Sequence, residues 1–325
     1  MKAPDFWQRG QGGVTATLLS PLGCVYGLAG HLRRSVTTPR QPARPVICIG
    51  NVVAGGAGKT PVALDVARRL QGRGKSVVFL SRGYGGTETG PHRVDPEKNR
   101  ADQVGDEPLL LSRQAPTWVA RDRIAGVKAA TPEGDVIIMD DGYQNPSLIK
   151  ACSLLVVDGR YGFGNGHLIP AGPLRETPQS AVARANAVVI VGPDDAEVEA
   201  TVSAYAPDLP LLRASVVPGP EVESLKGKKV TAFAGIGQPE KFFRTLTDAG
   251  CDVTRTRAFP DHHPYTLTDL DHLRSLAGEH KSLLVTTEKD WVRLPDGQRD
   301  GIEVLTITLQ WEDEAALNSL LETLF

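Results

Sequence analysis

This sequence of 325 residues contains few cysteines and almost no net charge. Its four cysteines, at positions 24, 48, 152 and 251, lie far apart and have no metal-ligand spacing. They indicate buried or free thiols in a reducing compartment. The formal net charge of −2 gives no general attraction to nucleic acid, so we expect no nucleic-acid partner. Repeats and low-complexity tracts are also absent, and the length suggests two domains.

The N-terminal segment lacks charge altogether between Arg9 and Arg33, where apolar residues recur at roughly helical spacing. Six glycines and Pro21 weaken it as a spanning helix, which needs about 20 predominantly apolar residues. It has no clear small-residue cleavage site, so we do not expect a signal peptide. Two interpretations remain: an interfacial anchor on an anionic membrane surface, or an amphipathic helix that covers the core. We favour the anchor and assign residues 1–34 to a membrane-associated helical segment.

A glycine-rich turn at 50–61 is the most informative feature of the chain. It follows an apolar run at 45–49 that is typical of a buried strand, and it precedes helical spacing at 62–70. Backbone N–H groups in such a turn approach phosphates closely, and the following helix N-terminus favours negative charge. Lys59 would reach the β- and γ-phosphates, and the Thr60 hydroxyl would bind magnesium. The predicted phosphate-binding residues are Gly55, Gly56, Ala57, Gly58, Lys59 and Thr60.

The match to a phosphate-binding loop is imperfect, because Val53 stands where the usual pattern has glycine. Gly55 and Gly56 supply the flexibility instead. An ordinary glycine-rich turn between a strand and a helix is the alternative. The Gly-Lys-Thr ending and the flanking strand and helix favour nucleotide binding.

Strand and helix patterns alternate after residue 45, which predicts an α/β protein with a mostly parallel sheet covered by helices on both faces. The expected strands of this first unit are 45–49, 76–80, 117–120, 136–139, 154–157 and 187–191. A second α/β unit is expected with strands at 229–234, 252–258, 282–286 and 303–309 and helices at 239–249 and 267–280. We place the first unit at 35–215 and the smaller second unit at 216–325.

Charged residues at predicted strand ends give the candidate metal and phosphate contacts. Asp140 and Asp141 end the strand at 136–139, which is the usual place of a second magnesium anchor beside a phosphate loop. A simple Asp-Asp-Gly turn is the alternative. Arg82 follows the strand at 76–80 and either contacts a phosphate or lies in a surface turn. Asp106 precedes a predicted helix, and on local evidence alone it is an N-cap.

The loop at 259–265 carries Asp261, His262 and His263 between prolines. Because histidine titrates near neutral pH, three titratable residues in a row suggest a site. Zinc binding is unsupported, since no cysteine or further histidine completes a ligand pattern. The later run at 287–290 does not match the guanine-reading pattern expected in a GTPase.

Taken together, these motifs resemble the tetraacyldisaccharide 4′-kinases, the lipid A 4′-kinases of Gram-negative bacteria. The motifs occur in family order over nearly the whole chain. The segments that carry the resemblance are 50–61, 81–85, 105–108, 140–144, 165–176, 259–263 and 287–290.

The resemblance implies a P-loop kinase fold and transfer of the ATP γ-phosphate to the 4′-hydroxyl of a lipid A disaccharide precursor. It implies ATP and Mg²⁺ as cofactors and the cytoplasmic face of the bacterial inner membrane as location; it implies no protein partner. It also turns Asp106 and His262 into a catalytic pair, with His263 the less favoured histidine, and places Glu176 near the metal. Val53 and Asn145 depart from the family pattern, but neither removes a group assigned to chemistry.

Two other function classes compete with the kinase. An ATP-driven switch or assembly protein would share the phosphate loop, but the loop at 259–263 favours an acceptor site. A soluble small-molecule kinase or ligase would not need the uncharged N-terminal segment.

Overall fold

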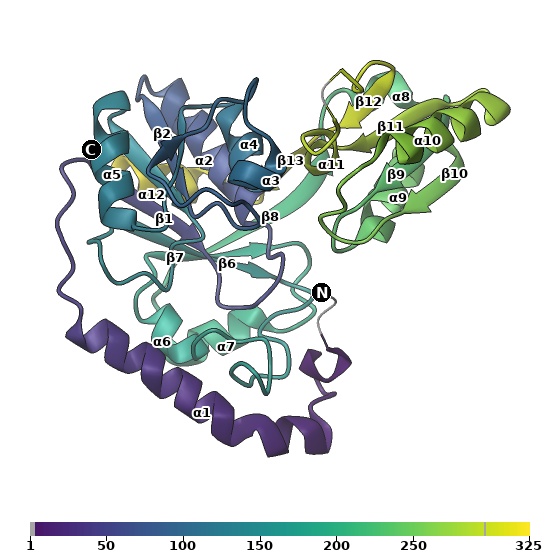
Figure 1. Cartoon of the computed structure of the whole chain (residues 1–325). Helices are drawn as coiled ribbons and strands as arrows, with labels where there is room; N and C mark the ends of the chain where they lie inside the picture. Colours follow the sequence, from purple (N-terminus) through teal and green to yellow (C-terminus); the bar gives the residue numbers. More distant parts are fainter. Residues whose placement is uncertain (1–3, 296) are drawn as a thin grey trace.

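The computed structural model describes residues 4–295 and 297–325, which form a large unit and a smaller unit side by side (Figure 1). The large unit is built on a nine-stranded sheet, and the smaller one on a four-stranded sheet. Both sheets are parallel except for the two outermost pairs of the large sheet, β13–β8 and β3–β4. The predicted α/β class with a mostly parallel sheet is therefore confirmed.

The strands of the large sheet lie in the order β13 (Ile307–Trp311), β8 (Leu211–Pro218), β7 (Ala187–Val191), β6 (Cys152–Asp158), β1 (Val46–Gly50), β5 (Val136–Asp140), β2 (Val77–Ser81), β4 (Thr117–Val119) and β3 (His92–Arg93). Those of the small sheet lie in the order β10 (Asp252–Ala258), β9 (Lys229–Ala234), β11 (Leu283–Thr287) and β12 (Ile302–Leu305).

The helices before the small unit are η1 (Asp5–Trp7), α1 (Gly13–Val36), α2 (Lys59–Gly72), α3 (Ala101–Val104), α4 (Asp106–Ser112), α5 (Arg123–Ala130), η2 (Thr131–Glu133), α6 (Pro178–Val182) and α7 (Val198–Tyr205). Those that follow are α8 (Val222–Leu225), α9 (Pro239–Asp248), α10 (Leu267–His280), α11 (Glu288–Trp291) and α12 (Glu314–Glu322).

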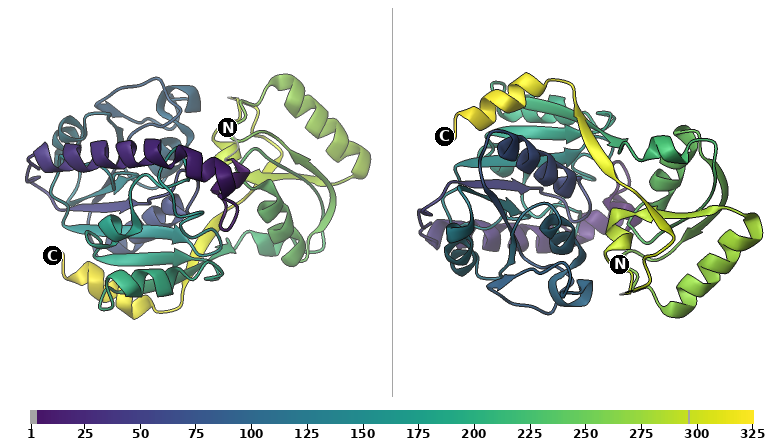
Figure 2. Two further views of the ribbon diagram at one scale, coloured as in Figure 1. Left: turned by 90° about the horizontal axis from the view of Figure 1, so that it is seen from below. Right: turned by 90° about the horizontal axis from the view of Figure 1, so that it is seen from above.

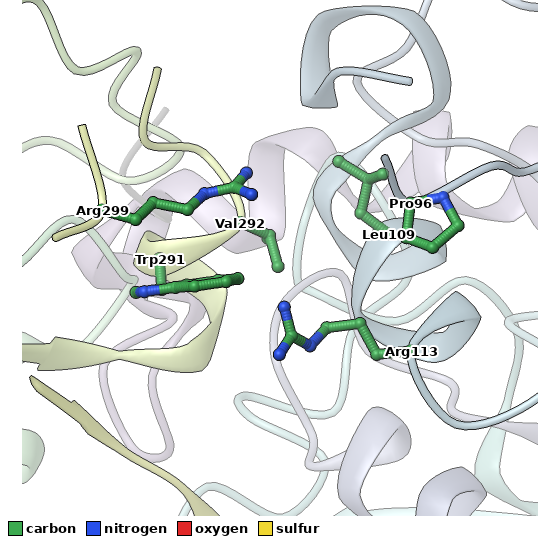
Figure 3. Close-up of a pocket in the computed structure, with 6 residues that line it drawn as sticks. All are labelled: Pro96, Leu109, Arg113, Trp291, Val292 and Arg299. Atoms are coloured by element: carbon green, nitrogen blue, oxygen red, sulfur yellow. The ribbon is translucent and has the colours of Figure 1, made fainter. Parts of the chain in front are cut away.

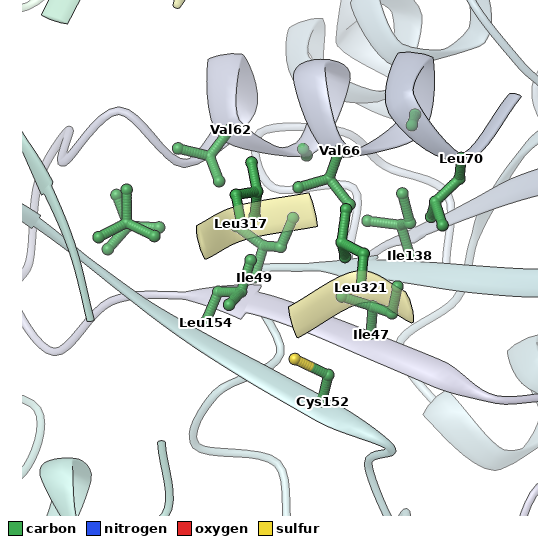
Figure 4. Close-up of a cluster of buried hydrophobic side chains, with 14 of the residues drawn as sticks. Ile47, Ile49, Val62, Val66, Leu70, Ile138, Cys152, Leu154, Leu317 and Leu321 are labelled. Carbon is green, nitrogen blue, oxygen red and sulfur yellow. The ribbon is translucent and has the colours of Figure 1, made fainter. Parts of the chain in front are cut away.

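Helices cover both faces of the large sheet because the side chains of its central strands alternate between two buried clusters. Ile47 and Ile49 of β1 face α2 and α12, where Leu317 and Leu321 complete the cluster (Figure 4). Val46 and Cys48 of the same strand face the opposite way, toward α5, α6 and α7. Each strand is therefore apolar along its whole length, as expected for a parallel sheet buried on both sides.

The second unit does not run to the end of the chain as predicted for 216–325. The expected strand at 303–309 is two strands: β12 belongs to the small sheet, and β13 pairs antiparallel with β8 of the large sheet. The Trp311 indole donates to Asp65 of α2 at 2.8 Å, and α12 then fills one face of the large core. Burial of these apolar residues draws the C-terminus back, so the small unit is an insertion between β8 and β13.

Helix α1 lies along one side of the large unit, below the sheet in Figure 1 and across the molecule in the left view of Figure 2. The contact between α1 and the large unit is narrow and includes a close approach of Gly23 and Gly27 to Leu168. A Cβ added at Gly23 would lie 3.4 Å from the Leu168 side chain, and one added at Gly27 would lie 2.6 Å from it. Only 11% of the most apolar stretch of α1 is buried. Among the described helices, α1 alone is long and apolar enough to cross a membrane.

Candidate functional site

The glycine-rich turn connects β1 to α2 at the carboxyl edge of the large sheet. Gly58 has φ +82°, a conformation that glycine adopts without strain, and α2 begins at the next residue. The Asn51 side chain donates to the carbonyls of Val53 and Gly55 at 3.0 and 3.3 Å, which fixes the curve of the loop. Val53 is buried in the core beside Leu174. A larger side chain is tolerated there because it packs inward.

Lys59 is largely buried and lies 3.5 Å from Asp141. Arg175 donates to the same carboxylate at 3.0 and 3.2 Å. Burial opposes the ionisation of Asp141, but Lys59 and Arg175 outweigh it and lower its pKa. Asp141 is therefore a paired carboxylate that orients the two cations.

Asp140, the last residue of β5, is fully buried, and neither of its carboxylate oxygens has a hydrogen-bond partner among the described residues. Burial raises its pKa to about 7, with a further contribution from the Glu107 charge. A buried carboxylate without a partner is costly, and a bound cation would remove that cost. Of the two predicted aspartates, Asp140 is thus the one whose oxygens remain available for a metal.

Glu176 is also buried, but its oxygens are engaged. Arg184 donates to it at 2.7 Å and Gln144 at 3.0 Å, while Arg34 at the end of α1 lies 3.5 Å away. The Gln144 amide also donates to the Asn51 carbonyl at 2.8 Å. Glu176 therefore links α1 to the base of the phosphate loop, and its predicted contact with a metal stays a prediction.

Asp106 and His262 come together across the two units, with His262 Nδ1 and Asp106 Oδ2 3.0 Å apart. The Glu107 backbone N–H donates to the other oxygen of Asp106 at 3.0 Å. Burial works against ionisation of Asp106, yet the His262 hydrogen bond and the charges of Lys289, His262 and Arg293 lower its pKa to about 2. Because the carboxylate is ionised at neutral pH, Nδ1 must carry the proton of this bond.

The geometry raises the basicity of the histidine and lowers that of the aspartate. The hydrogen bond to Asp106 raises the pKa of His262, although partial burial opposes the shift. His262 Nε2 lies 3.8 Å from Asp261, and about half of the side chain is exposed. His262 Nε2 is therefore a stronger base than the Asp106 carboxylate.

The neighbouring His263 is occupied by the small unit. Its Nε2 lies 3.1 Å from Asp269 in the first turn of α10, and its ring stacks on Phe259 with centroids 4.6 Å apart. These contacts orient His263 away from Asp106. The structure thus brings to Asp106 the histidine that the sequence favoured.

A buried ion network fixes the loop that carries His262. Asp290 accepts hydrogen bonds from the Gly235 N–H at 2.8 Å and the Tyr265 hydroxyl at 2.6 Å, and pairs with Arg293 at 3.1 Å. The Gly235 carbonyl in turn accepts from the His262 N–H at 3.0 Å and from Arg293 at 2.9 Å. This support lets His262 hold a positive φ of 58°.

Two charged residues without a sequence-based role lie beside the phosphate loop. Glu107 accepts from Thr60 Oγ1 at 3.4 Å and from Lys289 Nζ of α11 at 3.1 Å. Both belong to motifs noted in the sequence, but their roles depend on contact between units. Glu107 follows the predicted site residue Asp106 at the start of α4, and Lys289 lies at the start of α11 close to the end of β11. These positions were the signal in the sequence that could have identified them.

Two hollows lie near the contact between the units. One is lined by Arg82, Tyr84 and Arg121 at the ends of β2 and β4, and the Tyr84 ring lies 6.5 Å from that of His262. The other lies between α4 and α11, where Arg113 and Arg299 each lie 4.4 Å from the Trp291 ring (Figure 3). Arg82 thus borders the candidate site on the side of His262, and its contact with nucleotide stays a prediction.

Similarity to known proteins covers almost the whole chain. The family model described as Tetraacyldisaccharide-1-P 4′-kinase matches residues 15–325. The tetraacyldisaccharide 4′-kinase of Paramagnetospirillum magneticum is 50% identical over 323 residues, covering 99% of this chain and 98% of that protein. The protein of the same name from Rhodospirillum centenum is 48% identical over 329 residues, covering 100% of this chain and 97% of that protein.

A solved structure shares the fold. The apo form of LpxK from Aquifex aeolicus, in complex with ATP, aligns with a TM-score of 0.74 and 25% sequence identity, covering 95% of this chain and 99% of that one. The similarity therefore extends over both units. The chain belongs to the tetraacyldisaccharide 4′-kinase family.

Proposed function

We propose that this chain transfers the γ-phosphate of ATP to the 4′-hydroxyl of a tetraacyldisaccharide 1-phosphate, with His262 and Asp106 as the proton-accepting pair. The observation that carries the proposal is the 3.0 Å contact between Asp106 and His262, made across two units beside a phosphate-binding loop. An ATP-driven switch would not need a base of this kind. The family to which the chain belongs also favours the kinase over that alternative.

The pair supplies the chemistry that a sugar hydroxyl requires. Such a hydroxyl is a weak nucleophile, and a positioned base must take its proton as the phosphoryl group moves. His262 Nε2 takes the proton, while Asp106 holds Nδ1–H and stabilises the imidazolium that forms. The bond with Asp106 already raises the pKa of His262, so the histidine is a better base than an isolated one.

The phosphate loop binds and orients the other reactant. Backbone N–H groups of residues 55–60 and the start of α2 surround the phosphates of ATP, and Lys59 neutralises charge on the transferred group. Asp141, which also pairs with Arg175, keeps Lys59 directed to this place. Arg82, directly after β2, would contact a phosphate as well.

Mg²⁺ fits the residues at the end of β5. Within residues 4–295 and 297–325 no group of three or more His, Cys, Asp and Glu side chains is gathered as a metal site. Mg²⁺ does not need one, since one or two carboxylates plus substrate phosphates usually hold it. Asp140 and Thr60 would bind the ion, with Asp141 and Glu176 nearby. The ion would supply charge neutralisation on the transferred phosphate.

Helix α1 would place the enzyme on the cytoplasmic face of the inner membrane, where its lipid substrate resides. Its outward side presents Val14, Leu18, Leu22 and Val25, each more than half exposed. Arg33 is exposed in its last turn, where a cation favours an anionic surface. Most of the apolar surface of α1 is not used by the fold, which supports an interfacial role.

The first prediction concerns the catalytic pair. Asp106→Ala, His262→Ala and the double variant should have similar residual turnover, because two groups that act as one unit do not give additive losses. Each loss should be about 100- to 10,000-fold. In the wild type, turnover should fall as the pH drops through the raised pKa of His262; His262→Ala should lack this acidic limb, and in Asp106→Ala it should lie at lower pH.

Steady-state kinetics of the three variants across pH would measure this, with His263→Ala as the matched control. Multiplicative losses in the double variant would contradict a coupled pair. A large loss in a folded His263→Ala protein would show that the other histidine is the base.

The second prediction concerns the metal. Protons compete with Mg²⁺ for Asp140, so the affinity for Mg²⁺ should rise with pH up to about 7 and then level off. Asp140→Asn should reduce this dependence to the part that comes from the ADP phosphates. Asp141→Asn should retain it, because Asp141 is already ionised and paired with Lys59 and Arg175. Calorimetric titration of each protein with Mg²⁺ in the presence of ADP would measure the effect. The same pH dependence in Asp140→Asn and wild type would rule out Asp140 as the ligand.

The third prediction concerns the membrane. Replacing Leu18, Leu22 and Val25 together by Glu should reduce binding to anionic phospholipid vesicles by more than about 100-fold, since each apolar side chain contributes about 1.5–3 kcal/mol when buried. Stability should change little, because all three side chains are exposed. Leu267→Glu, at an exposed position on the small unit, is the control. Vesicle sedimentation measures binding. Unchanged binding would refute the anchor, and unfolding would show that α1 belongs to the core.

A further inference from the structure

Lys289 reaches out of the small unit toward the phosphate loop. It lies in α11, directly after β11, and its Nζ is 3.1 Å from Glu107 Oε1 of the large unit. The same oxygen accepts a hydrogen bond from Thr60 Oγ1 at 3.4 Å. A single carboxylate oxygen therefore joins the Lys289 ammonium to Thr60, the residue that would bind Mg²⁺ beside the phosphates of ATP.

The surroundings keep Lys289 charged. Burial lowers the pKa of its ammonium, but Glu107 and Asp106 outweigh burial and raise it, with a smaller contribution from Asp140. The side chain is 35% exposed, so it is not locked inside the interface. Lys289 is thus a partly exposed cation among three carboxylates, at the place where the phosphates of ATP are expected.

Docking of α11 does not depend on this lysine. Asp290 and Arg293 tie the helix to the small sheet, and Val292 packs with Val104 and Leu109 of the large unit. Arg113 stacks on Trp291 across the same interface. Because these contacts already hold α11, the Lys289–Glu107 pair adds little as a structural link, and partly exposed ion pairs contribute at most about 1 kcal/mol.

We propose that Lys289 is a second cation for phosphoryl transfer, which leaves Glu107 and contacts the γ-phosphoryl group when ATP and the acceptor are bound. This inference rests on the proposed kinase function. The acceptor oxygen forms a bond to the γ-phosphorus, the bond from that phosphorus to the bridging oxygen breaks, and ADP leaves. The acceptor proton goes to His262, while Lys289 keeps its proton and stabilises the charge on the moving group.

The two lysines would then approach the phosphate from different units. Lys59 belongs to the phosphate loop and is held by Asp141, whereas Lys289 arrives only when the small unit is in contact with α4. Binding of the small unit would in this way complete the site for transfer. A cation that acts mainly in the transition state lowers the barrier without tightening the binding of ATP.

The experiment compares Lys289→Met, Lys289→Arg and Lys241→Met in the full chain. Lys241 is the matched control, because it also pairs across the units, with Asp158 at 3.5 Å, but does not touch the phosphate loop residues. Lys289→Met should lower kcat about 100- to 1,000-fold, and Lys289→Arg should retain part of the activity. The Kd for ATP should change by less than about fivefold, since the lost contact stabilises the transition state and not the bound ATP. Lys241→Met should keep kcat within about twofold, as expected for an exposed pair.

A transition-state mimic separates a catalytic role from a structural one. ADP with aluminium fluoride, bound in the presence of the acceptor, should lose affinity in Lys289→Met by about the same factor as kcat, while the melting temperature stays near that of wild type. Near-normal kcat in Lys289→Met would overturn the inference. Equal losses of ATP and mimic binding, together with a lower melting temperature, would also overturn it and leave only an interface pair. A wild-type chain that does not phosphorylate the lipid acceptor would overturn the proposed function and this inference with it.

Discussion

The buried carboxylate of Asp290 is the constraint on which the shared site depends. It accepts from the Gly235 N–H, the Tyr265 hydroxyl and the Thr287 hydroxyl, and it pairs with Arg293. Arg293 in turn lies 3.8 Å from Asp106, so one ion network connects the small sheet to the candidate base. Removing one partner of a buried pair costs about 3–5 kcal/mol, because the other charge is left uncompensated. The order of the site shared by the two units therefore depends on this network.

The path of the chain places the phosphate loop and the histidine of the candidate base in different units. The small unit is inserted between β8 and β13, which pair with each other in the large sheet, so the chain leaves and re-enters at adjacent strands. The phosphate loop and Asp140 belong to the large unit, whereas His262 and Lys289 belong to the insertion. In the proposed mechanism, binding of nucleotide and assembly of the base are thus carried by different parts of the chain.

Local pattern was enough to predict the α/β class, the turn between β1 and α2 and the place of Asp140 at the end of β5, because each depends on elements that are contiguous in sequence. Local pattern failed at the C-terminus, where the single strand expected at 303–309 is two strands that belong to different sheets. The pairing of Asp106 with His262 came from family resemblance, since 156 positions separate the two residues. Glu107 and Lys289 received no role for the same reason: their chemistry exists only where two units meet. Residue spacing also gave no indication that Arg34 and Arg184 pair with Glu176.

The central claim is that Asp106, from the large unit, makes His262 of the small unit a stronger base. Nitrogen-detected NMR titration of histidine-labelled protein tests it most directly, with the His262 resonance assigned from His262→Gln. The account predicts that His262 in the wild type titrates above the ordinary histidine pKa of about 6.5. In Asp106→Asn the midpoint should fall toward that value, because the charged acceptor is gone. A midpoint that is the same in both proteins would contradict the account.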